Sequence, residues 1–275
     1  MTRDKAAGRD PGGVPPPESS PETILELREV SKALGGRTVL DRLSLAVYRG
    51  ETLVVLGRSG TGKSVTLRHI VGLETPDAGD VLYRGRSIAS MTQDELRSFR
   101  QKLGFVFQSA ALINWMSVYD NVALPLRENQ RLPEDEVRAA VKEQLAIVGL
   151  ENDGGKMPSS LSGGMKKRVG IARALAMRPE IILYDEPTAG LDPIMTRSID
   201  DLILKTRDVS KATSVVVTHD LESAFRIADR LAMLDGGRVV AAADPETFRN
   251  LSEPAVRDFL SGEESANGPF EENKR

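Results

Sequence analysis

Short apolar segments alternate along most of the chain with longer segments in which apolar residues recur every three or four positions. The short segments predict β-strands and the longer ones predict amphipathic helices. Their alternation is typical of an α/β domain with a largely parallel sheet. The strand-like segments are residues 25–30, 43–47, 52–56, 104–107, 181–184 and 214–218.

The early strand-like segments differ from the later ones in how their apolar residues are spaced. Leu43, Leu45 and Val47 alternate with other residues, as in an antiparallel strand that exposes one face. The segments 52–56 and 181–184 are continuously apolar, as strands buried on both faces of a parallel sheet are. We therefore expect an antiparallel β subdomain beside a parallel core.

Helix signals fill the middle of the chain. Thr92 and Glu95 have the spacing of a capping box. Pro133 stands where the first turn of a helix tolerates proline. The stretch from 109 to 156 reads as mostly helical, so we predict a helical insertion at about 109–166. One apolar stripe follows Pro133, formed by Val137, Ala140, Val141, Leu145 and Val148.

Composition narrows the setting in which such a domain works. Residues 1–21 and 263–275 are rich in Pro, Gly, Ser and charge, which predicts disorder on both sides of a domain at 22–262. The net charge of −3 argues against a generally basic surface for nucleic acid. The chain has no cysteine, which fits a reducing cytosol. It also lacks an apolar run long enough to span a bilayer and a signal-peptide segment, so any membrane role requires a partner.

A glycine-rich loop follows the strand-like segment 52–56 and precedes a predicted helix. It matches the phosphate-binding pattern G-x-x-x-x-G-K-[ST] in the strand–loop–helix context that this pattern requires. Glycines let the backbone wrap around phosphate, Lys63 is expected to reach the β- and γ-phosphates, and the Ser64 hydroxyl is expected to ligate Mg²⁺. The alternative, a glycine-rich turn that carries a lysine, fits this context poorly. The loop consists of Gly57, Arg58, Ser59, Gly60, Thr61, Gly62, Lys63 and Ser64.

Two carboxylates end the strand-like segment 181–184. Asp185 is placed to hold Mg²⁺ beside the phosphate-binding loop, and Glu186 to accept a proton from the attacking water. Alone, Asp-Glu after an apolar run usually marks a strand that meets solvent. The loop upstream favours the functional interpretation.

The segment Leu161-Ser162-Gly163-Gly164-Met165 stands at the start of a predicted helix. It resembles the LSGGQ signature of ATP-binding-cassette (ABC) proteins, with Met165 in place of Gln. By itself it would be read as an ordinary N-capped helix. In the family, two chains meet head to tail, and each signature closes over the ATP held by the other chain. The resemblance therefore implies that a second copy of this chain is a partner, and that Ser162, Gly163 and Gly164 contact its ATP.

Other positions of the family pattern follow in order. Gln108 resembles the glutamine that contacts Mg²⁺ and the attacking water, Asp192 resembles the residue that makes contacts across the dimer, and His219 resembles the switch histidine at the γ-phosphate. The resemblance covers about residues 24–260. It implies a P-loop NTPase core, and ATPase catalysis by Glu186, His219, Gln108 and Lys63. ATP and Mg²⁺ are the implied cofactors, with Ser64, Gln108 and Asp185 at the metal.

Two positions depart from the family pattern. Leu34 stands where an aromatic residue usually stacks on adenine, so adenine is expected to be held by apolar packing or by another residue. Val65 replaces the more frequent Thr after Ser64, which removes one hydroxyl contact to phosphate. His69, within the helix that follows the loop, is interpreted as a packing residue.

The combination of GKSV at 62–65 and LSGGMKKR at 161–168, together with segments 107–112 and 120–128, is similar to the ATPase subunits of Mla/Mce-type lipid transporters. That resemblance implies phospholipid trafficking in a bacterial envelope, from the cytoplasmic face of the inner membrane. It also implies a membrane permease and a lipid-binding Mce-type protein as partners. The alternatives are an ATPase of another importer or exporter and a soluble cassette acting on ribosomes or DNA. The acidic balance and the single cassette disfavour the latter, so no nucleic-acid partner is expected.

Two groups of side chains each have two possible roles. Trp115, Met116 and Tyr119 either contact the permease or pack inside the helical insertion, and the sequence favours neither. The basic segment Lys166-Lys167-Arg168 is interpreted as a solvated helix face rather than as a source of positive potential near nucleotide.

Overall fold

The computed structural model describes residues 21–129 and 132–266. The N-terminal segment predicted to be disordered lies outside the described residues, except for residue 21. At the other end, helix α9 (Pro254–Ala266) continues past the predicted boundary at 262. The rest of the predicted C-terminal tail, 267–275, also lies outside the described residues.

A six-stranded sheet forms the centre of the molecule, in the order β10-β9-β3-β8-β7-β6. All neighbouring strands from β9 to β6 pair in parallel, and only β10 is antiparallel, to β9. This confirms the predicted α/β core with a largely parallel sheet. The strands are β3 (Thr52–Leu56), β6 (Leu103–Val106), β7 (Ile181–Asp185), β8 (Thr213–Thr218), β9 (Arg230–Asp235) and β10 (Arg238–Ala243).

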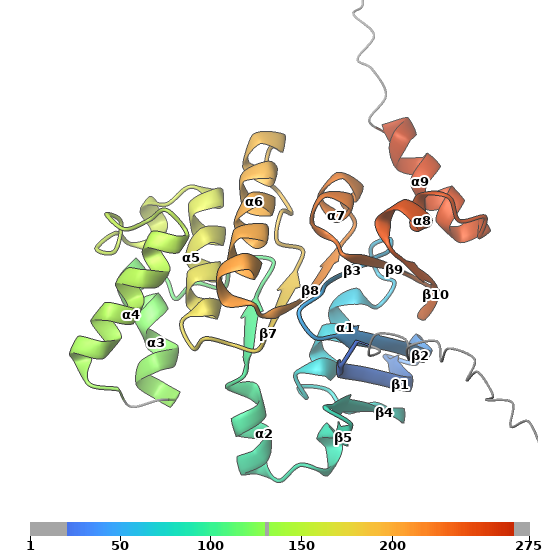
Figure 1. Cartoon of the computed structure of the whole chain (residues 1–275), viewed down its shortest axis with the longest axis horizontal. Coiled ribbons are helices and arrows are strands. Elements are labelled where there is room, and N and C mark those ends of the chain that lie inside the picture. The colour runs from blue at the N-terminus through green and yellow to red at the C-terminus, as the bar shows by residue number, and fades with distance from the viewer. Residues whose placement is uncertain (1–20, 130–131, 267–275) are drawn as a thin grey trace, which may run out of the picture.

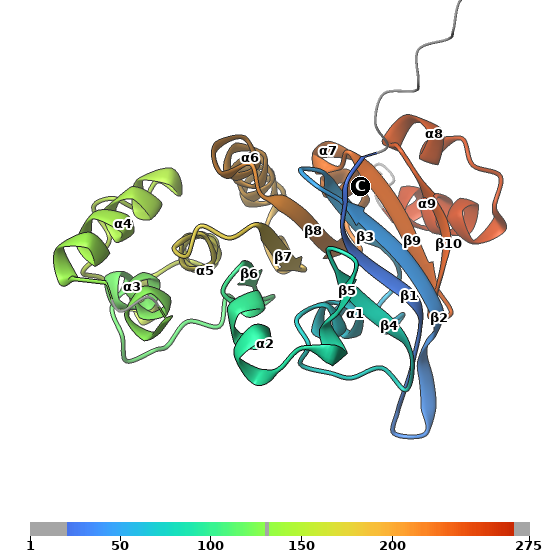
Figure 2. The same cartoon turned by 60° about the horizontal axis from the view of Figure 1, so that its bottom comes forward.

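A second, four-stranded sheet is antiparallel throughout, in the order β2-β1-β4-β5. It lies beside the large sheet on the side away from the helical insertion (Figure 2). The alternation of Leu43, Leu45 and Val47 is a true signal of this sheet, since all three side chains are buried. The strands are β1 (Thr23–Leu34), β2 (Arg37–Tyr48), β4 (Ala78–Tyr83) and β5 (Arg86–Ser87).

Helices cover the large sheet, and α3 and α4 form the predicted insertion beside α5 (Figure 1). The capping box of Thr92 and Glu95 is present in full at the start of α2. No helix in the described part of the chain is long and apolar enough to cross a bilayer. The remaining helices are α1 (Lys63–Ile70), α2 (Gln93–Arg100), α3 (Val118–Asn129), α4 (Glu134–Ile147), α5 (Gly163–Leu175), α6 (Pro193–Ser210), α7 (Leu221–Ile227) and α8 (Pro245–Arg249).

Two hydrophobic cores lie on the two faces of the large sheet, and β3 contributes to both. Val54 and Leu56 belong to the core beneath the helices α3 to α6. Leu53 and Val55 belong to the core shared with β1, β2 and α1, because successive side chains of a strand point to opposite faces. All four side chains are essentially inaccessible to solvent. The strand that leads into the glycine-rich loop is thus held from both sides.

Candidate nucleotide site

The glycine-rich loop joins the buried strand β3 to helix α1, as the sequence predicts. Gly57 has no room for a side chain, because a Cβ atom there would lie 2.5 Å from the carbonyl oxygen of Leu234. Gly62 adopts φ of +105°, a conformation that favours glycine, immediately before the helix begins. The Thr61 hydroxyl donates to the carbonyl of Arg58 at 2.9 Å and closes the loop upon itself.

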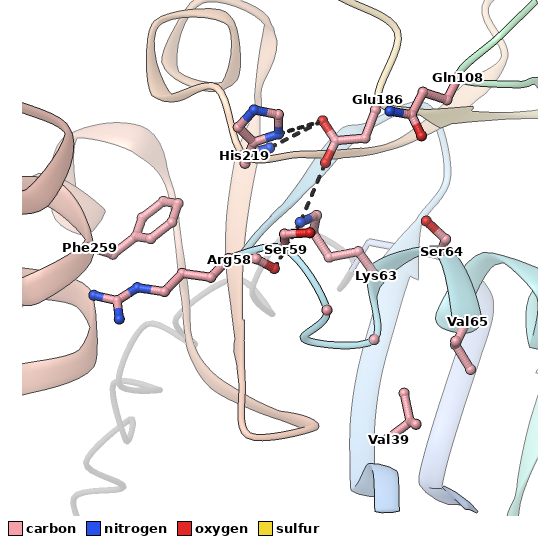
Figure 3. A pocket seen from close by; sticks show the side chains of 12 residues that line it. Val39, Arg58, Ser59, Lys63, Ser64, Val65, Gln108, Glu186, His219 and Phe259 are labelled. Atoms are coloured by element: carbon pink, nitrogen blue, oxygen red, sulfur yellow. Dashed lines mark hydrogen bonds and ion pairs between the residues drawn. The ribbon is translucent and has the colours of Figure 1, made fainter. Parts of the chain in front are cut away.

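Lys63 lies inside the curl of this loop and faces the end of β7. Its ammonium group donates to the carbonyl of Gly57 at 2.6 Å and to that of Arg58 at 3.1 Å. It also forms an ion pair with a carboxylate oxygen of Glu186 at 3.4 Å, and its side chain is only 6% exposed (Figure 3). The cation is therefore fixed between the loop backbone and the carboxylate.

The two carboxylates that end β7 have different neighbours. The Ser64 hydroxyl donates to an oxygen of Asp185 at 2.8 Å. Burial raises the pKa of Asp185, and the hydrogen bond from Ser64 opposes that rise. Glu186, with φ of 47°, turns out of the strand, and its second oxygen lies 2.9 Å from Nδ1 of His219. A serine–carboxylate pair and a glutamate–histidine pair thus flank Lys63.

Lys63, Ser64, Glu186 and His219 line one cavity of about 450 Å³. Asp185 does not line it but is hydrogen-bonded to Ser64, which does. Gln108, two residues after the end of β6, lies beside Glu186 (Figure 3). Two residues of the wall, Val39 of β2 and Phe259 of α9, were not predicted from the sequence, because neither belongs to a recognisable motif. The cavity is lined by Val39, Arg58, Ser59, Gly60, Gly62, Lys63, Ser64, Val65, Gln108, Glu186, His219 and Phe259.

The signature and Asp192 lie elsewhere in the chain and do not line this cavity. The Ser162 hydroxyl caps α5 by accepting from the backbone N–H of Met165. Asp192 caps α6 by accepting from the N–H groups of Ile194 and Met195. Ser162 and Asp192 are both exposed. Within one chain, the predicted second set of ATP contacts is therefore separate from the phosphate-binding loop.

The basic segment after the signature is not the solvated face that the sequence predicted. Lys167 is only 6% exposed, and its ammonium donates to the carbonyls of Gln108 and Glu186. Arg168 donates to the carbonyl of Val148 and the hydroxyl of Ser198, which joins α5 to α4 and α6. The prediction failed because charge in the sequence does not reveal which carbonyls the fold brings to a helix face.

Three other predictions concern single side chains. Trp115 is 80% exposed and does not pack inside the insertion, whereas Tyr119 packs partly buried against the helical core, so only Tyr119 follows the packing alternative. His69 is fully buried, with Nδ1 2.8 Å from the carbonyl oxygen of Val65, which confirms a packing role. Leu34, at the position where the family has its aromatic residue, is not part of the cavity wall.

Comparisons with known proteins agree with this architecture. A family described as "ABC transporter" matches residues 40–189. The "Intermembrane phospholipid transport system ATP-binding protein MlaF" of Escherichia coli is 39% identical over 252 residues, which cover 92% of this chain and 93% of that protein. The "Probable ribonucleotide transport ATP-binding protein mkl" of Mycobacterium tuberculosis is 40% identical over 238 residues. That match covers 86% of this chain, which spans only 66% of the length of the mycobacterial relative.

Solved structures give the same result. The dimeric bacterial ABC transporter cassette MJ0796 is 36% identical, with a TM-score of 0.74 over 81% of this chain and 99% of that one. A post-hydrolysis dimer of MJ0796, bound to ADP and phosphate, has a TM-score of 0.73 at 35% identity, over the same shares of both chains. The family match spans the phosphate-binding loop, the signature and both carboxylates. The chain therefore belongs to the ABC transporter family.

Proposed function

We propose that two copies of this chain sandwich two ATP molecules head to tail and use their hydrolysis to drive phospholipid transport by a membrane permease. The observation that carries the proposal is that Lys63, Ser64 and Glu186 line one cavity, with Asp185 hydrogen-bonded to Ser64, while Ser162 lies outside it. A single chain thus offers half of each site. The similarity to MlaF over 93% of that protein supports phospholipid as the cargo.

The phosphates of ATP are expected to lie along the glycine-rich loop. Lys63 balances charge on the β- and γ-phosphates, and its low exposure strengthens that interaction. The Ser64 hydroxyl and the Asp185 carboxylate, 2.8 Å apart, are hard oxygen ligands that fit Mg²⁺ with few protein contacts. Bound Mg²⁺ neutralises charge on the phosphates. Gln108 lines the same cavity as Ser64, and we expect it to share this role.

Hydrolysis is in-line attack of water on the γ-phosphorus. Glu186 accepts the proton of that water, because its carboxylate faces the cavity between Lys63 and His219. His219 holds one oxygen of Glu186. The other oxygen pairs with Lys63 here and is expected to become available to the attacking water when the phosphates engage Lys63. The leaving group is ADP, whose charge Lys63 continues to balance.

Substitution of Glu186 tests the proton transfer. Glu186→Gln keeps the shape of the side chain, so the variant should bind ATP normally and accumulate as a closed dimer. Its turnover should fall by about a hundredfold or more, since general-base catalysis contributes that much. Glu222→Gln, an exposed glutamate on α7, is the matched control. ATP turnover within about threefold of the wild type in Glu186→Gln would remove Glu186 from the role of base.

Crosslinking tests the head-to-tail arrangement. The chain has no cysteine, so introduced thiols are the only ones present. Mixed Ser59→Cys and Ser162→Cys chains, both exposed positions, should form an intersubunit disulfide when ATP is present in a Glu186→Gln background. In the control, Asp208→Cys replaces Ser162→Cys. Asp208 lies about 20 Å along α6 from the start of that helix. Absence of the Ser59–Ser162 crosslink with ATP would refute the sandwich.

The transport partners are inferred from exposed apolar side chains near Gln108. Phe107 is 41% exposed and Trp115 is 80% exposed, although both are large and apolar. We expect the permease to cover them. The cassette would then work on the cytoplasmic face of the inner membrane, in a complex with a lipid-binding Mce-type protein. Co-purification tests this: a permease that carries bound phospholipid supports the proposal. A permease that carries another solute instead would overturn the cargo assignment.

A further inference from the structure

Three residues on one face of helix α5 hold the segment that follows Gln108. Lys167, Gly170 and Arg173 are spaced three apart, so they lie along the same side of the helix. Lys167 donates to the carbonyl of Gln108, and Arg173 donates to the carbonyls of Ala110 and Ala111 at 2.7 Å each. The three residues form a stripe against 108–111.

The segment conforms closely to this stripe. Ala110 and Ala111 have φ of 60° and 46°, a left-handed conformation that costs a non-glycine residue free energy. A Cβ atom on Gly170 would lie 3.3 Å from Cβ of Ala110, so the segment touches the helix where the helix has no side chain. The cost is offset because the two alanine carbonyls meet the guanidinium of Arg173.

Lys167 makes a second contact that reaches the catalytic region. Its ammonium lies 3.2 Å from the carbonyl oxygen of Glu186, the residue whose side chain contacts Lys63 and His219. Burial lowers the pKa of Lys167, and the nearby carboxylates of Glu186 and Asp185 oppose that effect. A buried cation needs such acceptors, because burying an unpaired charge costs much free energy. The backbone ends of β6 and β7 are thus joined through one side chain of α5.

We propose that Lys167 is a positioning residue for ATP hydrolysis, which fixes the backbone of Gln108 relative to that of Glu186. With Arg173 it also makes the segment 108–111 move together with the helix that carries Ser162 at its start. A displacement of this segment by a membrane partner would then reach the signature and Glu186 at the same time. The inference rests on the proposed role of Glu186 as the base.

The test compares variants of the full chain. Lys167→Met should lower kcat by about tenfold, because a charge-assisted hydrogen bond is lost at both carbonyls. The KM for MgATP should change by less than about threefold, since Lys167 does not line the cavity. Lys167→Arg should restore kcat to within about threefold of the wild type, because a guanidinium keeps the positive charge and can donate to more than one acceptor. Lys166→Met, one position earlier and partly exposed, removes the same charge and should leave kcat unchanged.

Hydrogen exchange provides a readout that does not depend on activity. In Lys167→Met, the backbone amides of 107–111 should exchange about tenfold faster, whereas those of α4 should keep the wild-type rate. If Lys167→Met fails to fold, kcat and hydrogen exchange at 107–111 are measured in Lys167→Gln instead. The glutamine side chain is shorter and uncharged, so it also removes the charge-assisted hydrogen bonds of Lys167.

Two results would overturn the proposal. One is a kcat within about threefold of the wild type together with unchanged exchange at 107–111. The other is faster exchange throughout the described domain with a parallel loss of ATP binding, which would make Lys167 a general structural residue. Retained turnover in Glu186→Gln would instead refute the base, and the exchange of 107–111 would still decide whether Lys167 fixes this segment.

Discussion

The buried carboxyl group of Asp200 provides a measurable link between pH and stability. It lies on α6, is 1% exposed, and accepts from the Ser223 hydroxyl at 3.0 Å. The same hydroxyl lies 3.2 Å from Asp220, and its single hydrogen cannot serve both carboxylates. The other Asp200 oxygen is buried without a hydrogen-bond partner. Burial raises the pKa of Asp200 from 3.8 to about 6, with Asp220 adding to the rise and Arg226 opposing it.

The sign and size of the effect follow from this pKa. The folded protein holds the Asp200 proton more tightly than the unfolded chain, so the stabilisation is present at low pH. It is lost as the pH rises from about 4 to about 6, by about 3 kcal/mol in total. Above that window the contribution is constant. At neutral pH the folded state therefore carries a buried charge that a neutral side chain would avoid.

Asp200→Asn tests this because asparagine is neutral at every pH. Urea unfolding at pH 4 and pH 7 gives the free energy of unfolding of both proteins. The stability of the variant relative to the wild type should be greater at pH 7 than at pH 4 by about 2 kcal/mol. The comparison between two pH values cancels any constant cost of an unpaired amide. Asp208→Asn, which removes an exposed carboxylate farther along α6, is the control. A relative stability that is equal at both pH values would refute the reasoning.

Three further substitutions test the site. Ser64→Ala should lower MgATP turnover by about tenfold, through loss of a hydroxyl beside Asp185, and a steady-state assay that finds wild-type turnover would refute the metal assignment. Gly57→Ala should abolish ATP binding, measured by calorimetry, because its Cβ would press on the carbonyl of Leu234; normal affinity would contradict this. Leu34→Tyr should tighten ATP binding by about fivefold or more, since an aromatic ring stacks on adenine. An unchanged Kd would mean that Leu34 is remote from the base.

The sequence predicted best those elements in which local pattern and buried position agree. The strand 52–56 is observed with the predicted bounds, and the capping box of Thr92 and Glu95 is present in full. The phosphate-binding loop was recognisable because its backbone conformation and close contacts require glycine at fixed positions. Among the residues of the cavity, Lys63, Ser64 and Glu186 could be named because each stands at the end of a strand or at the start of a helix, whereas His219 was named from the resemblance to the family.

What the sequence did not reveal depends on contacts between distant segments. The strands β4, β5, β9 and β10 were missed, and β5 has only two residues, which are paired because β4 lies beside them. Lys167 was assigned to solvent because a run of cations usually is exposed, and only the fold shows the carbonyls that it meets. Phe259 reaches the cavity through the packing of α9, which no local pattern records.

The strand β3 shares its side chains between two cores, and this has a consequence for how the cassette can be driven. Any shift of the phosphate-binding loop would displace β3. Leu53 and Val55 would then lose their packing in one hydrophobic core, and Val54 and Leu56 would lose theirs in the other. The phosphate-binding loop is therefore expected to stay fixed relative to the large sheet. A conformational change coupled to ATP hydrolysis is expected to move the parts that lie around the loop, above all the helical insertion with α5. The nucleotide would keep its position on the loop.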